Sequence, residues 1–408
     1  MSGILMTKVS TPFIGWAASL LGIVMDAIYN FLSNTFGIRD LGVCIILLTI
    51  VIYTCMIPLT IKQQKFSKLS AAMNPEIQKV QNKYKNKKDQ ASLQKQQEET
   101  QAIYKKYGVS PMGGCANMLI QMPFLFGMFY VIRSIPAYVN NVKEVYLPLI
   151  KGITATEGWQ PIMESIGVAK PILINPEKFD YTQTNTLVDV LYKFQGTTWE
   201  TLMDKFPHLE STIDATMTEV NSISNFFGIN IAEAPLSLIT SGFKTGAFTL
   251  AIAALCIPLL AGLTQYISAQ LTTASTSSNQ NDQMSQTMKQ MNITMPIMSA
   301  LMCFTMPSGL GIYWIVSAVV RTIQQVFINM YFSKISLDDI VKKNMEKAEK
   351  QREKELKAAI PTSTRKVKTT VNDKEVEEKL AARRAKGGKA GSLASKANMV
   401  DKLNEKNK

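Results

Sequence analysis

Two apolar stretches decide the fold: LGVCIILLTIVIYTCMIPL at residues 41–59 and PMGGCANMLIQMPFLFGMFYVI at residues 111–132. Neither contains a charged residue, and each is close to the length of about 20 residues that a helix needs to cross a bilayer. Between them, residues 62–108 contain 11 Lys and 4 Asp or Glu, a net charge of +7. The pattern predicts two transmembrane helices joined by a basic segment that lies in water.

The basic segment has the periodicity of a helical hairpin. Apolar residues recur three and four positions apart along its first half: Phe66, Leu69, Met73, Ile77, Val80 and Tyr84. Pro75 is expected to bend this first helix. A second helix is expected from Gln90 to Tyr107, ending at Gly108. The hairpin is either a solvated, Lys-coated element or a docking surface for anionic lipid, ribosomal RNA or an emerging polypeptide.

Three further apolar stretches follow, at residues 246–269, 293–306 and 310–332. The sequence Pro307-Ser308-Gly309 predicts a tight turn between the last two. Hydrophobic residues make up 46% of the chain and charged residues only 18%, which is typical of a membrane protein. The sequence therefore predicts five transmembrane helices.

The charge distribution predicts the orientation of these helices. The tail, residues 333–408, has 21 basic and 12 acidic residues, whereas residues 136–244 have 7 basic and 12 acidic residues. Lys- and Arg-rich segments remain cytoplasmic. The hairpin and the tail are thus expected inside, and the N-terminus and the acidic segment outside. From residue 361 onward the tail is polar and Lys-rich, and it is predicted to be disordered.

Residues 13–36 are largely apolar, but small and polar residues recur along them at intervals of three and four. These are Gly15, Ser19, Gly22, Asp26, Asn30 and Ser33. Such a stripe predicts an amphipathic helix in the membrane interface, with Trp16 and Tyr29 at the level of the lipid headgroups. The alternative is a sixth transmembrane helix. No signal peptide is evident.

These expectations divide the chain into ten parts. In order they are an outer N-terminus with the interfacial helix (1–40), the first span (41–61), the cytoplasmic hairpin (62–110), the second span (111–135), an acidic outer loop or small domain (136–245), the third span (246–270), a cytoplasmic loop (271–290), the fourth span (291–307), the fifth span (308–332) and the basic cytoplasmic tail (333–408).

The residues for most catalytic and metal chemistry are missing from the sequence. All five Cys lie in apolar stretches, and no pair has the spacing of metal ligands. His208 is the only histidine, and no Walker-type phosphate-binding motif occurs. We therefore expect no enzymatic activity, no catalytic residue, no cofactor and no metal.

Four polar residues are predicted near the middle of the membrane. Arg321 lies about 16 Å along a helix that starts at Leu310, and Tyr53 and Gln121 lie at similar depths in the first two spans. Thr49 precedes Tyr53 by one helical turn. Because polar groups in lipid are costly, these residues are expected to face each other or a water-filled recess. Ordinary hydrogen bonding between helices, with Arg321 extended toward the cytoplasm, is the alternative.

Three blocks of sequence resemble the YidC family of membrane protein insertases. They are IPLTIKQQKFSKLSAAMNPEIQKVQNKY after the first span, YKKYGVSPMGGCANMLIQMPFLFGMFY across the second, and PSGLGIYWIVSAVVRTIQQ in the last. The resemblance covers residues 13–135 and 225–333, whereas 151–224 looks like an insertion. It implies an all-α integral membrane protein, an insertase bundle of five transmembrane helices with a cytoplasmic helical hairpin and an N-terminal interfacial helix.

The resemblance also implies a hydrophilic groove that is open to the cytosol and to lipid. The family commonly has an arginine in this groove where the present chain has Tyr53, and we expect Arg321 to supply the missing positive charge. Thr49, Gln121, Tyr313 and Trp314 match positions that line the groove or contact substrates.

The expected partners are nascent membrane proteins, the ribosome through the tail or hairpin, anionic lipids and the Sec translocon, but not DNA. The short form resembles that of Gram-positive bacteria, so the expected location is a bacterial cell membrane. A channel or transporter is the main alternative function, although no repeated halves are evident. A membrane scaffold, which needs no polar recess, is another.

Overall fold

The computed structural model describes residues 8–9, 11–85, 89–109, 113–169, 180–194, 196–274 and 283–359. The chain forms two compact units, Met1–Lys343 and Asn344–Lys408. The predicted disorder of the tail from residue 361 lies outside the described residues. All elements discussed below belong to the first unit, except that α16 (Leu337–Ala359) extends into the second.

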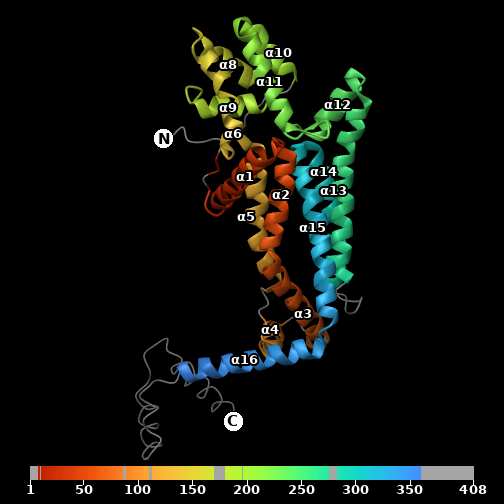
Figure 1. Cartoon of the computed structure of the whole chain (residues 1–408). Coiled ribbons are helices and arrows are strands. Elements are labelled where there is room, and N and C mark those ends of the chain that lie inside the picture. Colours follow the sequence, from red (N-terminus) through yellow and green to blue (C-terminus); the bar gives the residue numbers. More distant parts are fainter. Residues whose placement is uncertain are drawn as a thin grey trace, which may run out of the picture. The chain divides into compact units, whose positions relative to one another are not determined.

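The long helices of the first unit include the predicted spans and the hairpin (Figure 1). They are α1 (Ile14–Phe36), α2 (Leu41–Cys55), α3 (Ile57–Tyr84), α4 (Gln90–Tyr107), α5 (Gly113–Arg133), α13 (Phe248–Ala274), α14 (Gln283–Thr305) and α15 (Ser308–Ser333). Local sequence sets several of their ends. Asp40 begins α2 because its carboxylate accepts hydrogen bonds from the amides of Gly42 and Val43. Gly108 ends α4 in the left-handed conformation, with φ 65°.

Shorter elements fill the segment between α5 and α13. They are η1 (Ile135–Ala137), α6 (Asn140–Glu144), α7 (Leu147–Thr154), α8 (Trp159–Ala169), α9 (Thr184–Tyr192), α10 (Gly196–Lys205), η3 (Pro207–Leu209), α11 (Glu210–Ser224), β1 (Asn225–Phe226), β2 (Ile229–Asn230) and α12 (Pro235–Thr245). The two strands pair antiparallel, with Asn225 opposite Asn230. Fully buried residues such as Tyr146, Leu187 and Phe206 form the core of α6–α11. The sequence analysis described this segment only as an acidic outer loop or small domain.

Among the described residues, three helices are long and apolar enough to span a membrane: α1, α13 and α15. Helices α2 and α3 qualify together, as a pair bent by 53°. An apolar part of α14, Asn292–Thr305, is shorter, and the side chains of the first eight residues of α5 lie outside the description. The predicted class, an all-helical membrane protein, is confirmed.

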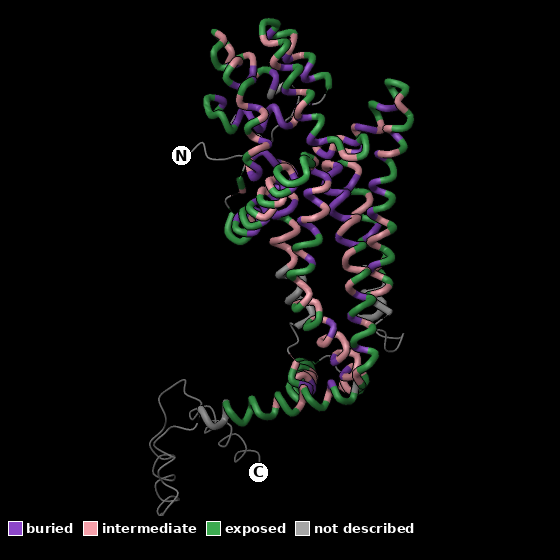
Figure 2. The backbone as a smooth tube through the Cα atoms, viewed as in Figure 1, coloured by how far each residue is buried: buried purple, intermediate pink, exposed green. Residues whose placement is uncertain are grey.

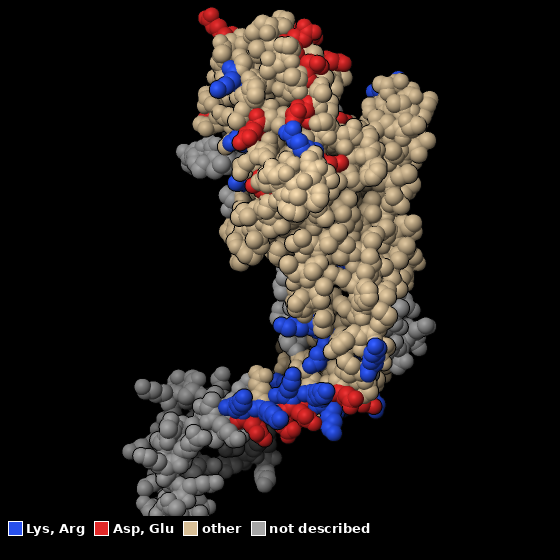
Figure 3. Space-filling model, in the orientation of Figure 1, with Lys and Arg blue, Asp and Glu red and all other residues tan. Residues whose placement is uncertain are grey.

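Charged side chains are absent from the middle of the face in Figure 3. Within the first unit they gather over the α6–α11 segment. The α3–α4 hairpin carries further exposed charges, such as Lys83 and Lys106. The helices between them present exposed apolar side chains, such as Leu259 and Leu263 on α13 and Phe327 on α15. This charge-free belt has the surface expected of a protein in contact with lipid.

Two predicted boundaries differ from the helix ends. α3 begins at Ile57, because Pro58 fits the first turn of a helix but has no amide hydrogen to continue α2. The predicted boundary at residue 62 thus falls inside α3. Similarly, α14 begins at Gln283, within the predicted loop 271–290.

Close helix packing holds the membrane part together. α13 packs against α12, α14 and α15, α2 packs against α15, and α1 packs against α5. Gly311 on α15 permits part of this packing, since a side chain there would collide with Ile257 and Cys303. Figure 2 shows buried residues concentrated where these helices meet.

Most of the small and polar stripe of α1 lies against protein. Gly15 and Gly22 are buried and Asp26 is half-buried, whereas Ser19 is exposed. Gly22 contacts Tyr138, and the Asp26 carboxylate accepts a hydrogen bond from the Asn140 amide at 2.9 Å. The opposite face exposes large apolar residues, including Trp16 and Ile23. Small residues permit close approach, so the stripe is a packing surface. In Figure 1, α1 crosses α5 obliquely; its position in the interface stays a prediction.

The α3–α4 hairpin has a small core and charged edges. Met73, Ile103 and Tyr107 are the buried residues of this core. Ion pairs join Lys106 to Glu76 at 2.8 Å and Lys83 to Glu99 at 2.6 Å. Only part of the predicted apolar seam therefore packs inside the hairpin. Leu69, which belongs to the seam, packs instead near Ile328 of α15.

Candidate functional site

A cluster of polar side chains lies between α2, α13 and α15, within the charge-free belt. It contains Tyr53 from α2, Gln265 from α13, and Tyr313, Arg321 and Gln324 from α15. The close packing of α15 against both other helices brings these residues together. We call this group the Arg321 cluster.

Arg321 is the charged centre of the cluster. Its Nε donates to the carbonyl oxygen of Ser317 at 3.2 Å, and a terminal nitrogen donates to Oε1 of Gln265 at 3.2 Å. Its guanidinium carbon lies 5.9 Å from the centre of the Tyr53 ring, within range of a cation–π interaction. Ser317 is one turn toward the start of α15, so the side chain points away from the end of the helix that leads to the tail.

Neighbouring groups hold Tyr53 beside the guanidinium. Tyr53 and Tyr313 lie close together, and both residues are buried. Gln324 donates to the carbonyl oxygen of Tyr53 at 2.9 Å, which satisfies a group near the bend between α2 and α3. This network fixes α2 against α15 at the level of Arg321.

Arg321 has no carboxylate partner among the residues that the structure describes. Its hydrogen-bond acceptors are a neutral amide and a backbone carbonyl. A charge in an apolar environment costs roughly 2.5–3.5 kcal/mol on insertion scales, and neutral acceptors offset only part of this cost. The cluster is therefore suited to attract an anionic group that enters the belt.

The six predicted site residues are only partly brought together. Tyr53, Tyr313 and Arg321 belong to the cluster. Trp314 directly follows Tyr313 on α15 and is buried. Its carbonyl oxygen accepts a hydrogen bond from the Ser317 hydroxyl.

Two other predicted residues do not join the cluster. The Thr49 hydroxyl donates to the Ile45 carbonyl of its own helix at 2.7 Å, as in the ordinary structural alternative. Gln121 is half-buried on α5, and among the described residues no hydrogen bond joins it to the cluster.

Sequence reasoning missed Gln265 and Gln324. Gln324 follows Arg321 by three residues, so it lies on a neighbouring part of the same helix face. Gln265 is the only amide side chain in the apolar stretch 246–269, which is a signal that a search for polar residues within spans would find. A second polar contact, from Gln325 to Gln64 at 3.2 Å, continues toward the hairpin.

No group of three or more His, Cys, Asp or Glu side chains that could hold a metal ion occurs among the described residues. The cluster itself offers amide and hydroxyl groups, a cation and two aromatic rings. Its chemistry suits recognition of an anion rather than bond cleavage.

Comparison with known families is decisive at this point, because a family described as "60Kd inner membrane protein" matches residues 31–335. The chain belongs to this family. The 60Kd inner membrane protein match spans α2, the hairpin, the α6–α11 segment and all helices of the Arg321 cluster.

Several curated relatives of the 60Kd inner membrane protein family are similar to parts of the chain. Membrane protein insertase MisCA of Bacillus subtilis is 48% identical over 122 residues, covering 28% of this chain and 46% of that protein. Membrane protein insertase YidC of Bifidobacterium longum is 36% identical over 141 residues, covering 34% and 41%. YidC 1 of Halalkalibacterium halodurans is 36% identical over 133 residues, covering 30% and 51%.

The matched stretches span about half the length of these relatives. These relatives and the family match confirm the resemblance to YidC insertases.

Proposed function

We propose that this protein is a membrane protein insertase and chaperone, which inserts integral membrane proteins and helps them fold. The single observation that carries the mechanism is Arg321, a cation inside the charge-free belt that has no carboxylate partner among the described residues. The names of the relatives support the activity. In this proposal Arg321 replaces the arginine that the family commonly has at the position of Tyr53.

The proposed mechanism lowers the cost of moving polar groups across the membrane. Apolar segments of a substrate leave the groove for lipid beside α13 and α15, whose outer faces are apolar. An acidic tail that must cross is drawn to Arg321, since opposite charges attract more strongly where water is scarce. Thr49, Gln121, Tyr313 and Trp314 are proposed to line or support the same path. Gln265 and Tyr53 hold the guanidinium of Arg321 in place while no substrate is bound.

The proposed setting is a bacterial cell membrane, with the N-terminus outside and the C-terminus in the cytoplasm. Nascent membrane proteins are the proposed substrates. The Lys-rich hairpin and the tail are proposed to contact the ribosome or anionic lipids. We propose that the protein acts alone or beside the Sec translocon.

The test is insertion of a single-span substrate with an acidic outer tail into proteoliposomes, scored by protease protection of the tail. The full chain is expected to insert this substrate. Arg321→Ala is expected to reduce insertion at least tenfold, which corresponds to about 1.4 kcal/mol. A matched substrate with a neutral tail should be affected less than twofold.

Two control variants separate charge from packing. Arg321→Lys keeps the charge and should retain most of the activity. Ile323→Ala alters an exposed apolar residue on the same helix and should leave insertion unchanged. Equal insertion by Arg321→Ala and the full chain would overturn the role of Arg321. Sustained ion conductance by the pure protein would instead support a channel.

A further inference from the structure

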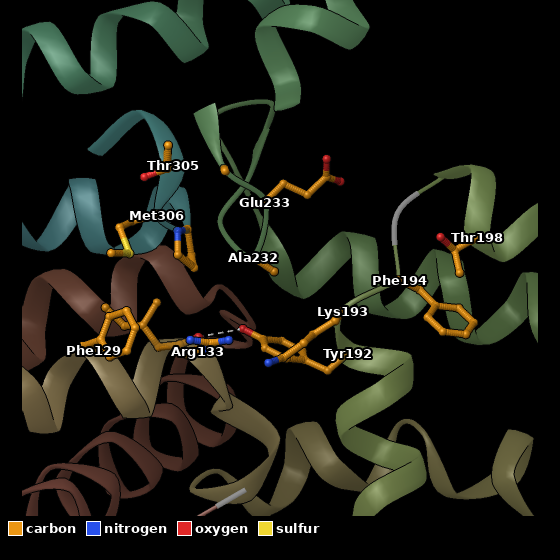
Figure 4. Close-up of a pocket in the computed structure, with 13 residues that line it drawn as sticks. Phe129, Arg133, Tyr192, Lys193, Phe194, Thr198, Ala232, Glu233, Thr305 and Met306 are labelled. Carbon is orange, nitrogen blue, oxygen red and sulfur yellow. Dashed lines mark hydrogen bonds between the residues drawn. The ribbon is translucent and has the colours of Figure 1, made fainter. Parts of the chain in front are cut away.

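A second site lies at the edge of the charge-free belt, between the end of α5 and the α6–α11 segment. It is a cavity of about 530 Å³, a volume within the range of small-ligand sites. Its walls come from four separate parts of the chain: residues 129–133, 192–198, 232–234 and 305–307. We call it the α5–α9 cavity (Figure 4).

Two cations face this cavity, Arg133 from the end of α5 and Lys193 from the end of α9 (Figure 4). The Tyr192 hydroxyl donates to the Ile132 carbonyl oxygen at 3.1 Å. Because these two residues directly precede Lys193 and Arg133, this buried hydrogen bond holds the two cations on neighbouring walls.

Neither cation forms an ion pair with any described residue. Burial, together with the nearby charge of Arg133, lowers the pKa of Lys193 to about 8, and the attraction of Asp189 offsets part of this effect. The guanidinium carbon of Arg133 lies 5.7 Å from the centre of the Phe129 ring, within range of a cation–π interaction. The two positive charges therefore repel each other in a partly enclosed space and would be stabilised by a shared anion.

Glu233 lies across the cavity from the cations, on the turn that follows β2 (Figure 4). Its backbone carbonyl accepts hydrogen bonds from the amide and hydroxyl of Ser308, each 2.7 Å long, so this wall is fixed to the start of α15. Its Oε1 accepts a hydrogen bond from the Asn230 side-chain amide at 3.3 Å. An ionised carboxylate has further lone pairs, so Glu233 can also accept a hydrogen bond from a hydroxyl. With Glu233 ionised, the cavity carries two positive charges and one negative charge.

The remaining walls are apolar and belong to the ends of the spans. Phe129 and Ile132 come from α5, and Met306 and Pro307 from the turn between α14 and α15. These residues mark the level where the apolar belt ends, which is where lipid headgroups meet the protein.

We propose that the α5–α9 cavity binds the headgroup of an anionic phospholipid of the phosphatidylglycerol type. Its phosphate lies between Arg133 and Lys193, and a glycerol hydroxyl donates to Glu233. A phosphate presents several oxygens in different directions, so one group can bridge two cations on separate walls. The single negative charge of the lipid matches the net charge of the cavity. The proposal does not depend on insertase activity.

Native mass spectrometry of the full chain in detergent, with equal amounts of phosphatidylglycerol and phosphatidylcholine of identical acyl chains, tests the proposal. The full chain is expected to retain phosphatidylglycerol preferentially. The double variant Arg133→Gln with Lys193→Gln is expected to lose at least fivefold of this lipid. Lys205→Gln removes an exposed cation on α10 and is the matched control, with no expected change.

A charge-preserving double variant, Arg133→Lys with Lys193→Arg, addresses folding. It should keep lipid retention within twofold, with an unchanged circular dichroism spectrum. Undiminished retention by the charge-removing variant would overturn the proposal, as would loss of retention in a folded charge-preserving variant.

Two competitors distinguish the source of the anion. Inorganic phosphate in large excess should leave the lipid bound, because it lacks the glycerol and acyl groups. Displacement by phosphate would indicate a site for free anions, and displacement by an acidic peptide would indicate a site for a protein segment. Either result would overturn the assignment to lipid.

Discussion

The Arg321 cluster and the α5–α9 cavity both hold buried or half-buried cations, but they stabilise them differently. Arg321 lies among neutral partners, Gln265 and Tyr53, and meets no carboxylate in the described chain. Arg133 and Lys193 lie near the carboxylates of Asp189 and Glu233. The cluster sits between long helices, whereas the cavity is bounded by a segment with its own large core.

The difference concerns how long an anion can stay. A cation with only neutral partners attracts an anion without providing further contacts, which suits a substrate that must leave. A cavity with two cations, a carboxylate and a fixed wall can select one headgroup and retain it. The following four predictions test this contrast, from the largest expected effect to the smallest.

Asp189→Asn is expected to stabilise the protein by about 2 kcal/mol at pH 8. Burial raises the pKa of Asp189 to about 7, and its Oδ1 has no hydrogen-bond partner. The unfolded chain releases this proton near pH 4, but the folded chain keeps it until about pH 7, so stability falls as pH rises between these values. The difference between the folded and unfolded pKa values corresponds to about 4 kcal/mol. The variant also removes the attraction between Asp189 and Lys193, so we expect only about half of this gain in stability.

Thermal unfolding in detergent between pH 5 and pH 8 measures this effect. The full chain should lose stability as pH rises, and the variant should lose less. Asp204→Asn, on the exposed surface of α10, is the control. Identical pH profiles for the full chain and Asp189→Asn would contradict the prediction.

Tyr53→Arg is expected to rescue Arg321→Ala, restoring at least tenfold in insertion of a substrate with an acidic tail. The guanidinium of Arg321 lies 5.9 Å from the Tyr53 ring, so a cation from α2 would occupy nearly the same place. The proteoliposome assay measures the rescue, and Tyr53→Gln in the same background is the uncharged control. Rescue by both variants would show that charge is not the relevant property.

Gln265→Leu is expected to reduce insertion of acidic substrates about threefold, or roughly 0.6 kcal/mol. The variant removes the side-chain acceptor of Arg321 and leaves the charge in place, so the guanidinium loses its orientation. The nearby Leu263→Ala changes an exposed apolar residue of α13 and should have no effect. A loss as large as that of Arg321→Ala would indicate that Gln265 has a role of its own.

Glu76→Gln in the hairpin is expected to cost only about 0.5 kcal/mol of stability, because exposed ion pairs contribute little. Its carboxylate accepts hydrogen bonds from Lys106 and Tyr107, each 2.8 Å long. The hydrogen bond from Lys106 lowers the pKa of Glu76, so this contribution is present at neutral pH and is lost in acid. Protease resistance of the hairpin, compared with that of Lys95→Gln, measures the change. A loss of stability above about 2 kcal/mol would contradict the expectation that this exposed ion pair contributes little.

Much of the membrane architecture was predictable because hydropathy and charge act locally. The apolar stretches at 41–59 and 310–332 became α2 and the greater part of α15, and the seam of the hairpin is partly used in its core. The stripe of α1 was recognised, but its partner was not. Small residues that pack against Tyr138 and polar residues in water give the same pattern in sequence.

The site was predictable in part for the same reason. Arg321 was conspicuous as a charge within an apolar stretch, and its approximate depth placed it near Tyr53. Gln265 was not chosen, since nothing in the order of residues tells which face of α13 meets α15. Thr49 was chosen at the right depth, yet its hydroxyl bonds to its own helix.

The sequence by itself determined the helical membrane class, the basic hairpin, the family and the unusual position of Arg321, because each depends on composition or on short-range spacing. Only the tertiary structure decided that Gln265 and Tyr53 hold the guanidinium. It also created the α5–α9 cavity, whose walls come from residues 129–133, 192–198, 232–234 and 305–307. The physical reason is that helix packing joins residues far apart in the chain, and no local pattern records which faces meet.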